Sequence, residues 1–193
     1  MPPKAKVTRD MILDAAFDLV RSEGHEELTV RRLAAKLGCS TQPLMYQFAG
    51  IAEIRRAVYD RAGDFHTAYI TAFTGEYQDP LLEMGIRYIR FGAEEKALFR
   101  FLFQSGELGG KSLDELIADP GSAPILDVVT AGGEVAKEQA AKVFHMLFMA
   151  VHGWASLLAN NAMRWQEDEA AEMLVGLFMG LTNEGGNPHE KTL

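Results

Sequence analysis

The sequence has a single cysteine, no long hydrophobic run and no strand-like alternation of apolar and polar residues. One cysteine, Cys39, excludes an intrachain disulfide framework and suits a reducing compartment. No window approaches the roughly 18 uninterrupted apolar residues of a membrane-spanning helix, and the first residues, MPPKAK, contain no apolar signal segment. We therefore expect a soluble, cytoplasmic protein with no membrane partner.

The sequence also lacks the residue groupings that catalysis or metal binding requires. His145 and His152 lie seven residues apart on one expected helix, about 10 Å at ~1.5 Å per residue, too far to share one metal ion. The glycine-rich GELGGK stretch does not have the spacing of a phosphate-binding loop, and the serines have no base nearby in the sequence. The prediction is that the protein is not an enzyme and uses no metal and no cofactor.

The net charge of −8 is unevenly distributed along the chain. Residues 1–56 contain nine Lys and Arg against seven acids, whereas the remaining 137 residues contain ten against twenty. The N-terminal end is therefore net basic although the whole protein is acidic. This asymmetry favours a nucleic-acid-binding N-terminal segment attached to an acidic body.

Two short helices joined by a glycine turn are predicted over residues 29–48. Thr29 can cap the first helix, which ends at Gly38, and Ser40 is expected to cap the second. In the second helix, Leu44 and Phe48 are four residues apart and anchor one face on the core, so the opposite face is exposed. This is a helix-turn-helix with a candidate reading helix for double-stranded DNA.

The expected DNA contacts follow from this geometry. Gln42 and Tyr46 would meet base edges or thymine methyls, while Thr29, Arg31 and Arg32 would meet phosphates. Backbone amides near Gly50, at the start of the next helix, would add an anion site. The full predicted DNA-binding set is Thr29, Arg31, Arg32, Ser40, Thr41, Gln42, Pro43, Met45, Tyr46, Gln47 and Gly50.

Residues 8–62 resemble the DNA-binding segment of TetR-type transcriptional regulators. The features that carry the resemblance are Ala15, Ala16, Gly24, Thr29, Gly38, Ser40 and Phe48. The sequence departs from the usual family pattern at two positions, because Met45 and Ile51 replace a common tyrosine and lysine that contact phosphates. The resemblance implies a homodimeric, ligand-responsive transcriptional regulator, most often a repressor, with weaker or redistributed backbone contacts in this chain.

The rest of the chain continues with helical periodicity. We expect a first helix from Thr8 to Gly24, a long helix over residues 51–73, a pair between residues 80 and 104, and short helices at 112–118 and 123–131. The last two helices are expected at 134–161 and 167–182. The fold prediction is all-α with about nine helices, in which residues 1–50 form the DNA-binding domain and residues 51–193 the effector-binding and dimerisation domain.

The last two expected helices point to self-association. Residues 143–158 are apolar nearly all round, which a surface helix of a monomer would not be, and small residues recur on one stripe. An alternative is that the glycines serve only packing within the chain. The predicted dimer interface is Met146, Ala150, Gly153, Leu157, Met173, Gly176 and Gly180.

Aromatic and methionine side chains are abundant across the helices of the body, and most of them are expected to be core residues. The family resemblance implies that some of them line a cavity for an effector, expected to be small and hydrophobic. The candidate lining residues are Met84, Tyr88, Phe91, Phe101, Phe103, His145, Phe148, Met149 and His152. For the two histidines, a semi-buried ring bonded to a backbone carbonyl or water is the simpler alternative.

Two functions remain open at this level. The first is a homodimeric regulator, most often a repressor, that a small hydrophobic ligand releases from its DNA operator. The second is a helical small-molecule-binding protein or enzyme with a vestigial helix-turn-helix, which only Met45 and Ile51 favour.

Overall fold

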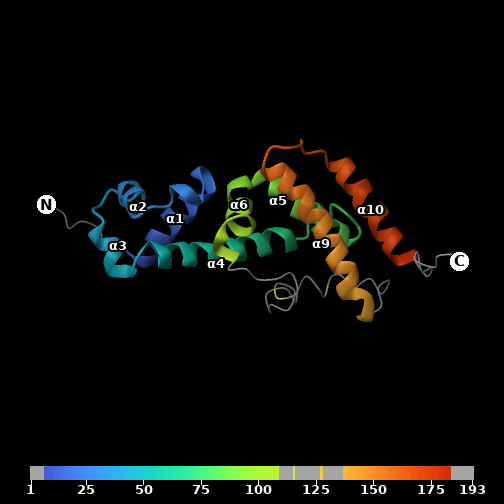
Figure 1. Ribbon diagram of the computed structural model, residues 1–193, viewed down its shortest axis with the longest axis horizontal. Helices are drawn as coiled ribbons and strands as arrows, with labels where there is room; N and C mark the ends of the chain where they lie inside the picture. Colours follow the sequence, from blue (N-terminus) through green and yellow to red (C-terminus); the bar gives the residue numbers. More distant parts are fainter. Residues whose placement is uncertain (1–6, 109–114, 116–126, 128–136, 184–193) are drawn as a thin grey trace, which may run out of the picture. The chain divides into compact units, whose positions relative to one another are not determined.

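The structure is a computed structural model that describes residues 7–108, 115, 127 and 137–183, with the backbone alone for 108, 137–141, 182 and 183. Over these residues the fold is all-α, as predicted, with eight α-helices, two short 3-10 helices and no strand (Figure 1). The short helices predicted at 112–118 and 123–131 fall on residues outside this range, apart from Glu115 and Asp127. The helices are α1 Arg9–Glu23, η1 His25–Glu27, α2 Val30–Lys36, α3 Gln42–Gln47, α4 Ile51–Thr71, α5 Pro80–Glu94, α6 Lys96–Phe103, η2 Gly106–Leu108, α9 Lys137–Ala159 and α10 Glu167–Asn183.

The caps and stops of the first helices follow the local sequence. The Thr8 side chain accepts a hydrogen bond from the Met11 amide, and α1 ends at Gly24, whose φ of 100° suits only glycine. After α2, Gly38 has a φ of 62°, and its amide and that of Cys39 donate to the carbonyls of Ala35 and Ala34. This is a Schellman closure, and it directs the chain into the turn before α3.

The start of α3 differs from the prediction. We expected Ser40 to cap this helix, but α3 begins at Gln42 with Thr41 at the N-cap and no side-chain cap bond. Thr41 has φ −70° and ψ −20°, a helical conformation, whereas a side-chain cap requires an extended one. The prediction of a Ser40 cap was therefore wrong, although Pro43 does lie in the first turn, where its missing N–H costs nothing.

The described residues form two compact units. The first contains the described residues of Met1–Ala68 and Glu94–Gly110, and the second those of Tyr69–Ala93 and Lys111–Leu193. The boundary that we predict at residue 50 does not coincide with this division, because most of α4 and all of α6 belong to the same unit as the helix-turn-helix. Helix α4 is continuous across the division at residue 68.

In the first unit, α1 packs against α2, α3 and α6. Its buried face includes Ile12, Ala16 and Val20, each fully buried. From α6, Phe101 is fully buried and stacks on the His25 ring at 5.5 Å. Helix α6, distant in sequence, therefore completes the core of the helix-turn-helix unit.

In the second unit, α9 packs against α10, and α5 meets α9 at Gly92 (Figure 1). Glu83, buried in α5, holds the connection from α4 to α5, because its carboxylate accepts the Thr74 amide at 2.6 Å, the Thr74 hydroxyl and the Gly75 amide. These hydrogen bonds, led by that of the Thr74 amide, hold the pKa of Glu83 below its usual value. Arg90 of α5 pairs with Glu167 at 2.7 Å and so attaches the first turn of α10.

Candidate nucleic-acid interface

Helix α3 presents one face to the core and the other to solvent. Leu44 and Phe48 are 0% and 2% exposed, as their spacing predicts. On the other side, Met45 is 44% exposed and Tyr46 is 77% exposed. The two most exposed large hydrophobic side chains among the described residues of the first unit therefore lie on the face that the sequence assigns to DNA.

Two of the predicted reading residues are hydrogen-bonded to each other. The Nε2 group of Gln42 donates to the Tyr46 hydroxyl at 2.9 Å, one helical turn along α3. Ser40 and Thr41 are also exposed, while Pro43, Gln47 and Gly50 are half-buried. The structure therefore brings Gln42, Met45 and Tyr46 together on one exposed surface, which we call the reading face.

The exposed cations of α2 divide into two kinds. Arg32 is engaged within the unit, because its guanidinium forms ion pairs with both Glu23 and Glu27. Arg31 and Lys36 are exposed, and neither has an ion-pair partner among the residues that the structure describes. Thr29 caps α2 by accepting the Arg32 amide at 3.3 Å. Of the two predicted arginines, Arg31 is the one left available for a phosphate.

Arg9 holds the end of α3, a role that the sequence alone did not show. Its guanidinium donates to the Gln47 carbonyl at 2.8 Å and to Glu53 at 3.0 Å, and it lies over the Phe48 ring at 3.9 Å from the centroid. It therefore joins the start of α1 to the end of α3 and the start of α4. A basic residue ahead of a helix-turn-helix was the only signal, because the partners are 38 and 44 residues away.

The amides at the start of α4 are only partly available for an anion. The Ala49 amide already donates to Glu53 at 2.7 Å. This bond and then the Arg9 contact lower the pKa of Glu53, so its carboxylate stays ionised at neutral pH. The predicted anion site at Gly50 therefore lies beside a carboxylate, which disfavours phosphate there.

The predicted ligand-binding residues lie in both units. Phe101 and Phe103 belong to the first, where Phe103 meets the His66 ring at 5.3 Å and Phe101 contacts Tyr59 and His25. The other candidates lie on α5 and α9 of the second unit. Of these, Met149 is 59% exposed, and Met84 and Phe91 are buried.

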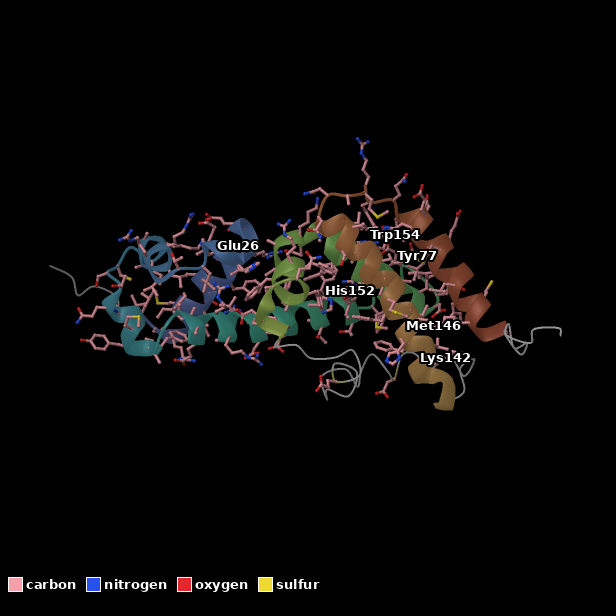
Figure 2. The ribbon with its side chains drawn as sticks, in the orientation of Figure 1. Glu26, Tyr77, Lys142, Met146, His152 and Trp154 are labelled. Carbon is pink, nitrogen blue, oxygen red and sulfur yellow. The ribbon has the colours of Figure 1, made fainter. Side chains whose placement is uncertain are left out.

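A polar pair joins α5 and α9 within an aromatic cluster. The Tyr88 hydroxyl lies 2.9 Å from Nδ1 of His152, and the Phe148 ring stacks on His152 at 5.2 Å (Figure 2 labels His152). Burial raises the pKa of the Tyr88 phenol and lowers the pKa of His152. At neutral pH the phenol therefore keeps its proton and the imidazole is neutral, and the imidazole tautomer decides which of the two groups donates.

The predicted dimer residues share the outer face of α9 and α10. Met146 is 37% exposed and Leu157 is 50% exposed, and Val175 and Met179 extend the same apolar surface at 37% and 57% (Figure 2 labels Met146). A Cβ added at Gly153, Gly176 or Gly180 would meet nothing within 4 Å among the described residues of the chain. These glycines therefore do not serve packing within the chain, at least against its described part. The remaining predicted members, Ala150 and Met173, are half-buried.

Within the described residues, one helical stretch is long and apolar enough by length and composition to cross a membrane. It is Lys142–Ala159, with a mean hydropathy of 1.2 over 18 residues, and 39% of it is buried in the chain. Core helices pass the same criterion, and this stretch carries much of the packing against α5 and α10.

Among the described residues, no group of three or more His, Cys, Asp or Glu side chains is placed to hold a metal ion. Cys39 is half-buried in the turn before α3.

Comparison with known proteins places this arrangement among transcriptional regulators. Residues 81–178 match the family described as "Tetracyclin repressor-like, C-terminal domain". An uncharacterized HTH-type transcriptional regulator of Mycobacterium tuberculosis (strain ATCC 25618 / H37Rv) is 27% identical over 190 residues, covering 94% of this chain and 86% of the relative. An HTH-type transcriptional repressor of Streptomyces coeruleorubidus is 37% identical over 59 residues, 31% of this chain and 22% of the relative.

A solved structure has the same fold. The TetR family protein ActR from Streptomyces coelicolor, crystallised in complex with (S)-DNPA, superposes with a TM-score of 0.58 at 19% identity, over 92% of this chain and 98% of that one.

Proposed function

Because the chain belongs to the tetracycline repressor-like, or TetR-type, family, we propose that it is a homodimeric DNA-binding regulator, a repressor that a small hydrophobic ligand releases from its operator. The observation that carries the DNA-binding part is the reading face of α3. Polar and apolar side chains stand exposed there on a helix whose opposite side is fully buried. The protein would act in the cytoplasm, with no membrane partner and no enzymatic step.

The phosphate contacts of this proposal are tested by measuring how the DNA affinity of each variant depends on salt concentration. Arg31→Ala is expected to weaken binding to specific and random duplexes alike and to reduce the slope of log affinity against log salt by about 1, because one exposed cation no longer displaces a counterion. Arg32→Ala is the matched control. Since Arg32 is already paired with Glu23 and Glu27, its loss should leave the slope unchanged.

The measurement is fluorescence anisotropy on duplexes from the DNA upstream of the coding sequence and on random duplexes, at four or more salt concentrations. Absence of binding to either kind of duplex at low salt would contradict DNA binding. It would instead support a small-molecule-binding protein with a vestigial helix-turn-helix. Equal slopes for both variants would remove Arg31 from the interface.

Dimerisation through α9 and α10 is supported by their outer face. Five large apolar side chains are exposed there, Met146, Met149, Leu157, Val175 and Met179. Three glycines on the same helices have open space above them, which lets a second pair of helices approach closely. Burying this face in a second copy would also remove an exposed apolar patch that a soluble protein rarely presents.

The effector site that we propose surrounds the Tyr88 and His152 pair. A neutral phenol and a neutral imidazole among Phe148, Phe144 and Met84 offer hydrogen bonds without charge, which suits an apolar or aromatic ligand with one polar group. The polar pair of this cluster is uncharged at neutral pH, which disfavours a phosphorylated ligand. The related ActR structure contains a bound small molecule, (S)-DNPA, which agrees with a ligand-responsive function.

Helix α4 would couple the proposed effector site to the DNA-binding unit. Next to Tyr88 on α5, Arg87 donates to the Tyr69 carbonyl in the last turns of α4 at 2.7 Å and lies over the Tyr69 ring. At its other end, α4 is anchored in the first unit, where Ile54 and Val58 are fully buried. A ligand that shifts α5 would therefore also displace α4, which continues into the DNA-binding unit.

The expected result is that a hydrophobic ligand lowers operator affinity about 5- to 150-fold, the usual range of coupling between two sites. A thermal-shift screen of hydrophobic compounds would find ligands, and DNA competition at fixed salt would measure their effect. Arg87→Ala should bind the same compounds with little change but release DNA less, because its link to α4 is lost. Compounds that bind the wild type tightly and leave operator affinity unchanged would contradict ligand-controlled release.

A further inference from the structure

The reading face contains no cation. From Leu37 to Ile54 the sequence has no Lys or Arg, and the α3 side chains that face solvent are Gln42, Met45 and Tyr46. Arginine or lysine donating to guanine O6 and N7 is the commonest specific contact in a major groove. Helix α3 cannot form that contact, so its base preferences must come from amide, hydroxyl and apolar groups.

The amide of Gln42 is oriented by its neighbour. One Nε2 hydrogen is engaged by the Tyr46 hydroxyl at 2.9 Å, which leaves the second Nε2 hydrogen and the Oε1 oxygen for another partner. A donor and an acceptor side by side match adenine, which presents N7 as acceptor and its N6 amino group as donor in the major groove. Guanine presents two acceptors there and would leave Oε1 unpaired.

Met45 supplies the apolar part of the surface. Its side chain is 44% exposed and extends from the same face, between Gln42 and Tyr46 in sequence. Thymine is the base that carries a methyl group in the major groove, and apolar side chains distinguish it by burying that methyl. An exposed thioether also has no donor with which to satisfy the guanine acceptors.

We propose that α3 reads A·T base pairs: Gln42 binds adenine, Met45 contacts a thymine methyl, and Tyr46 is a positioning residue that holds the Gln42 amide. This deepens the proposed function and rests on it, since it names the composition of the operator half-site. The departure of Met45 from the family's usual tyrosine thus exchanges a phosphate contact for a base contact.

The test begins with selection of binding sites by the full-length protein from a random duplex pool, and continues with modified bases in the selected site. We expect A·T pairs at the half-site core. At the contacted adenine, 7-deazaadenine removes the N7 acceptor and should weaken binding about 5- to 150-fold. Uracil in place of the contacted thymine removes one methyl and should weaken binding about 3- to 5-fold. The same replacements outside the half-sites serve as controls.

Variants assign the contacts to residues. Gln42→Ala should bind the selected site with the same affinity whether the contacted base is adenine or 7-deazaadenine. Met45→Ala should likewise bind with the same affinity whether the contacted base is thymine or uracil. Tyr46→Phe keeps the ring but lacks the hydroxyl, so it should reduce the 7-deazaadenine effect while binding to random duplexes is unchanged. A structural role of Tyr46 alone would leave that effect intact.

Each failure has a distinct meaning. If the selected half-site depends on guanine at its core, or if Gln42→Ala remains sensitive to 7-deazaadenine, the A·T reading is wrong while DNA binding stands. If the selection recovers no site and no duplex binds at low salt, the proposed function itself fails and the inference with it.

Discussion

Gly92→Ala is expected to destabilise the second unit strongly, although it adds only one methyl group. A Cβ at this position would lie 2.7 Å from both the Cβ and the backbone oxygen of Ala155, and 2.8 Å from its Cα. Because backbone atoms of α9 cannot rotate away, α5 and α9 must separate along their contact. Overpacking of this kind typically costs about 1 to 3 kcal/mol, against a gain in helix propensity of at most about 1 kcal/mol.

Two other glycines provide matched controls in the same kind of measurement. In Gly85→Ala the one close contact of the added Cβ among the described residues is with the end of the Leu174 side chain at 2.9 Å, which can change rotamer, so a smaller loss is expected. Gly63→Ala meets nothing within 4 Å and lies inside α4, so it should be neutral or stabilising by up to about 1 kcal/mol. Chemical denaturation at fixed protein concentration would rank the three. Equal stability of Gly92→Ala and wild type would show that α5 and α9 do not meet so closely.

The Gly92 contact also bears on the proposed effector site. Tyr88 precedes Gly92 by one helical turn, and its partner His152 precedes Ala155 by three residues. Separation of the two helices at Gly92 would therefore lengthen the Tyr88 to His152 hydrogen bond. If folded Gly92→Ala protein no longer binds hydrophobic compounds, the proposed effector site depends on the close contact between α5 and α9 at Gly92.

The first unit shows how much of this molecule local sequence signals predict. Thr8, Gly24 and Thr29 act through backbone groups no more than four residues away, and all three end or begin helices where expected. Leu44 and Phe48 are buried because the helical period alone assigns them to one face. Ser40 does not cap α3, because Thr41 stands at the N-cap itself in a helical conformation.

Contacts between distant segments could not be predicted in the same way. Arg9 reaches Glu53, 44 residues away, and Tyr88 reaches His152, 64 residues away. No periodicity encodes such pairings, since each depends on how whole helices pack. The same limit explains why Phe101 and Phe103, grouped by composition with the residues of α5, lie in the first unit among His25, Tyr59 and His66.

Arg32 is an instructive intermediate case. Its charge and its place in α2 made it a candidate for phosphate binding, and it is 46% exposed. Its acids, Glu23 and Glu27, lie at the end of α1 and in η1, and the turn at Gly24 brings both to the same guanidinium. A cation on a basic segment is therefore available to a DNA phosphate only when it does not already form an ion pair with an acid of the same chain.

The second large effect is expected from closing the space above the glycines of α10. Gly176→Leu with Gly180→Leu should abolish the dimer at micromolar concentration, because two bulky side chains would hold the partner helices apart. A Cβ added at either glycine meets nothing within 4 Å among the described residues of its own chain, so the subunit itself should fold. Two reading faces must lie about 34 to 36 Å apart, or a multiple of that, to enter successive major grooves of one operator. A monomer has only one, so operator affinity should fall about 10²- to 10⁴-fold.

Light scattering and sedimentation would measure the oligomeric state, and anisotropy on full and half operators would measure binding. Gly63→Leu is the control, since it places the same side chain on α4, where an added Cβ meets nothing within 4 Å among the described residues, and it should remain dimeric. The double variant should bind a half operator as well as the wild type does, because its reading face is unchanged. A double variant that still dimerises, or a wild type that is monomeric, would move the interface away from α10. In a monomeric double variant, undiminished affinity for the full operator would mean that one subunit suffices for recognition.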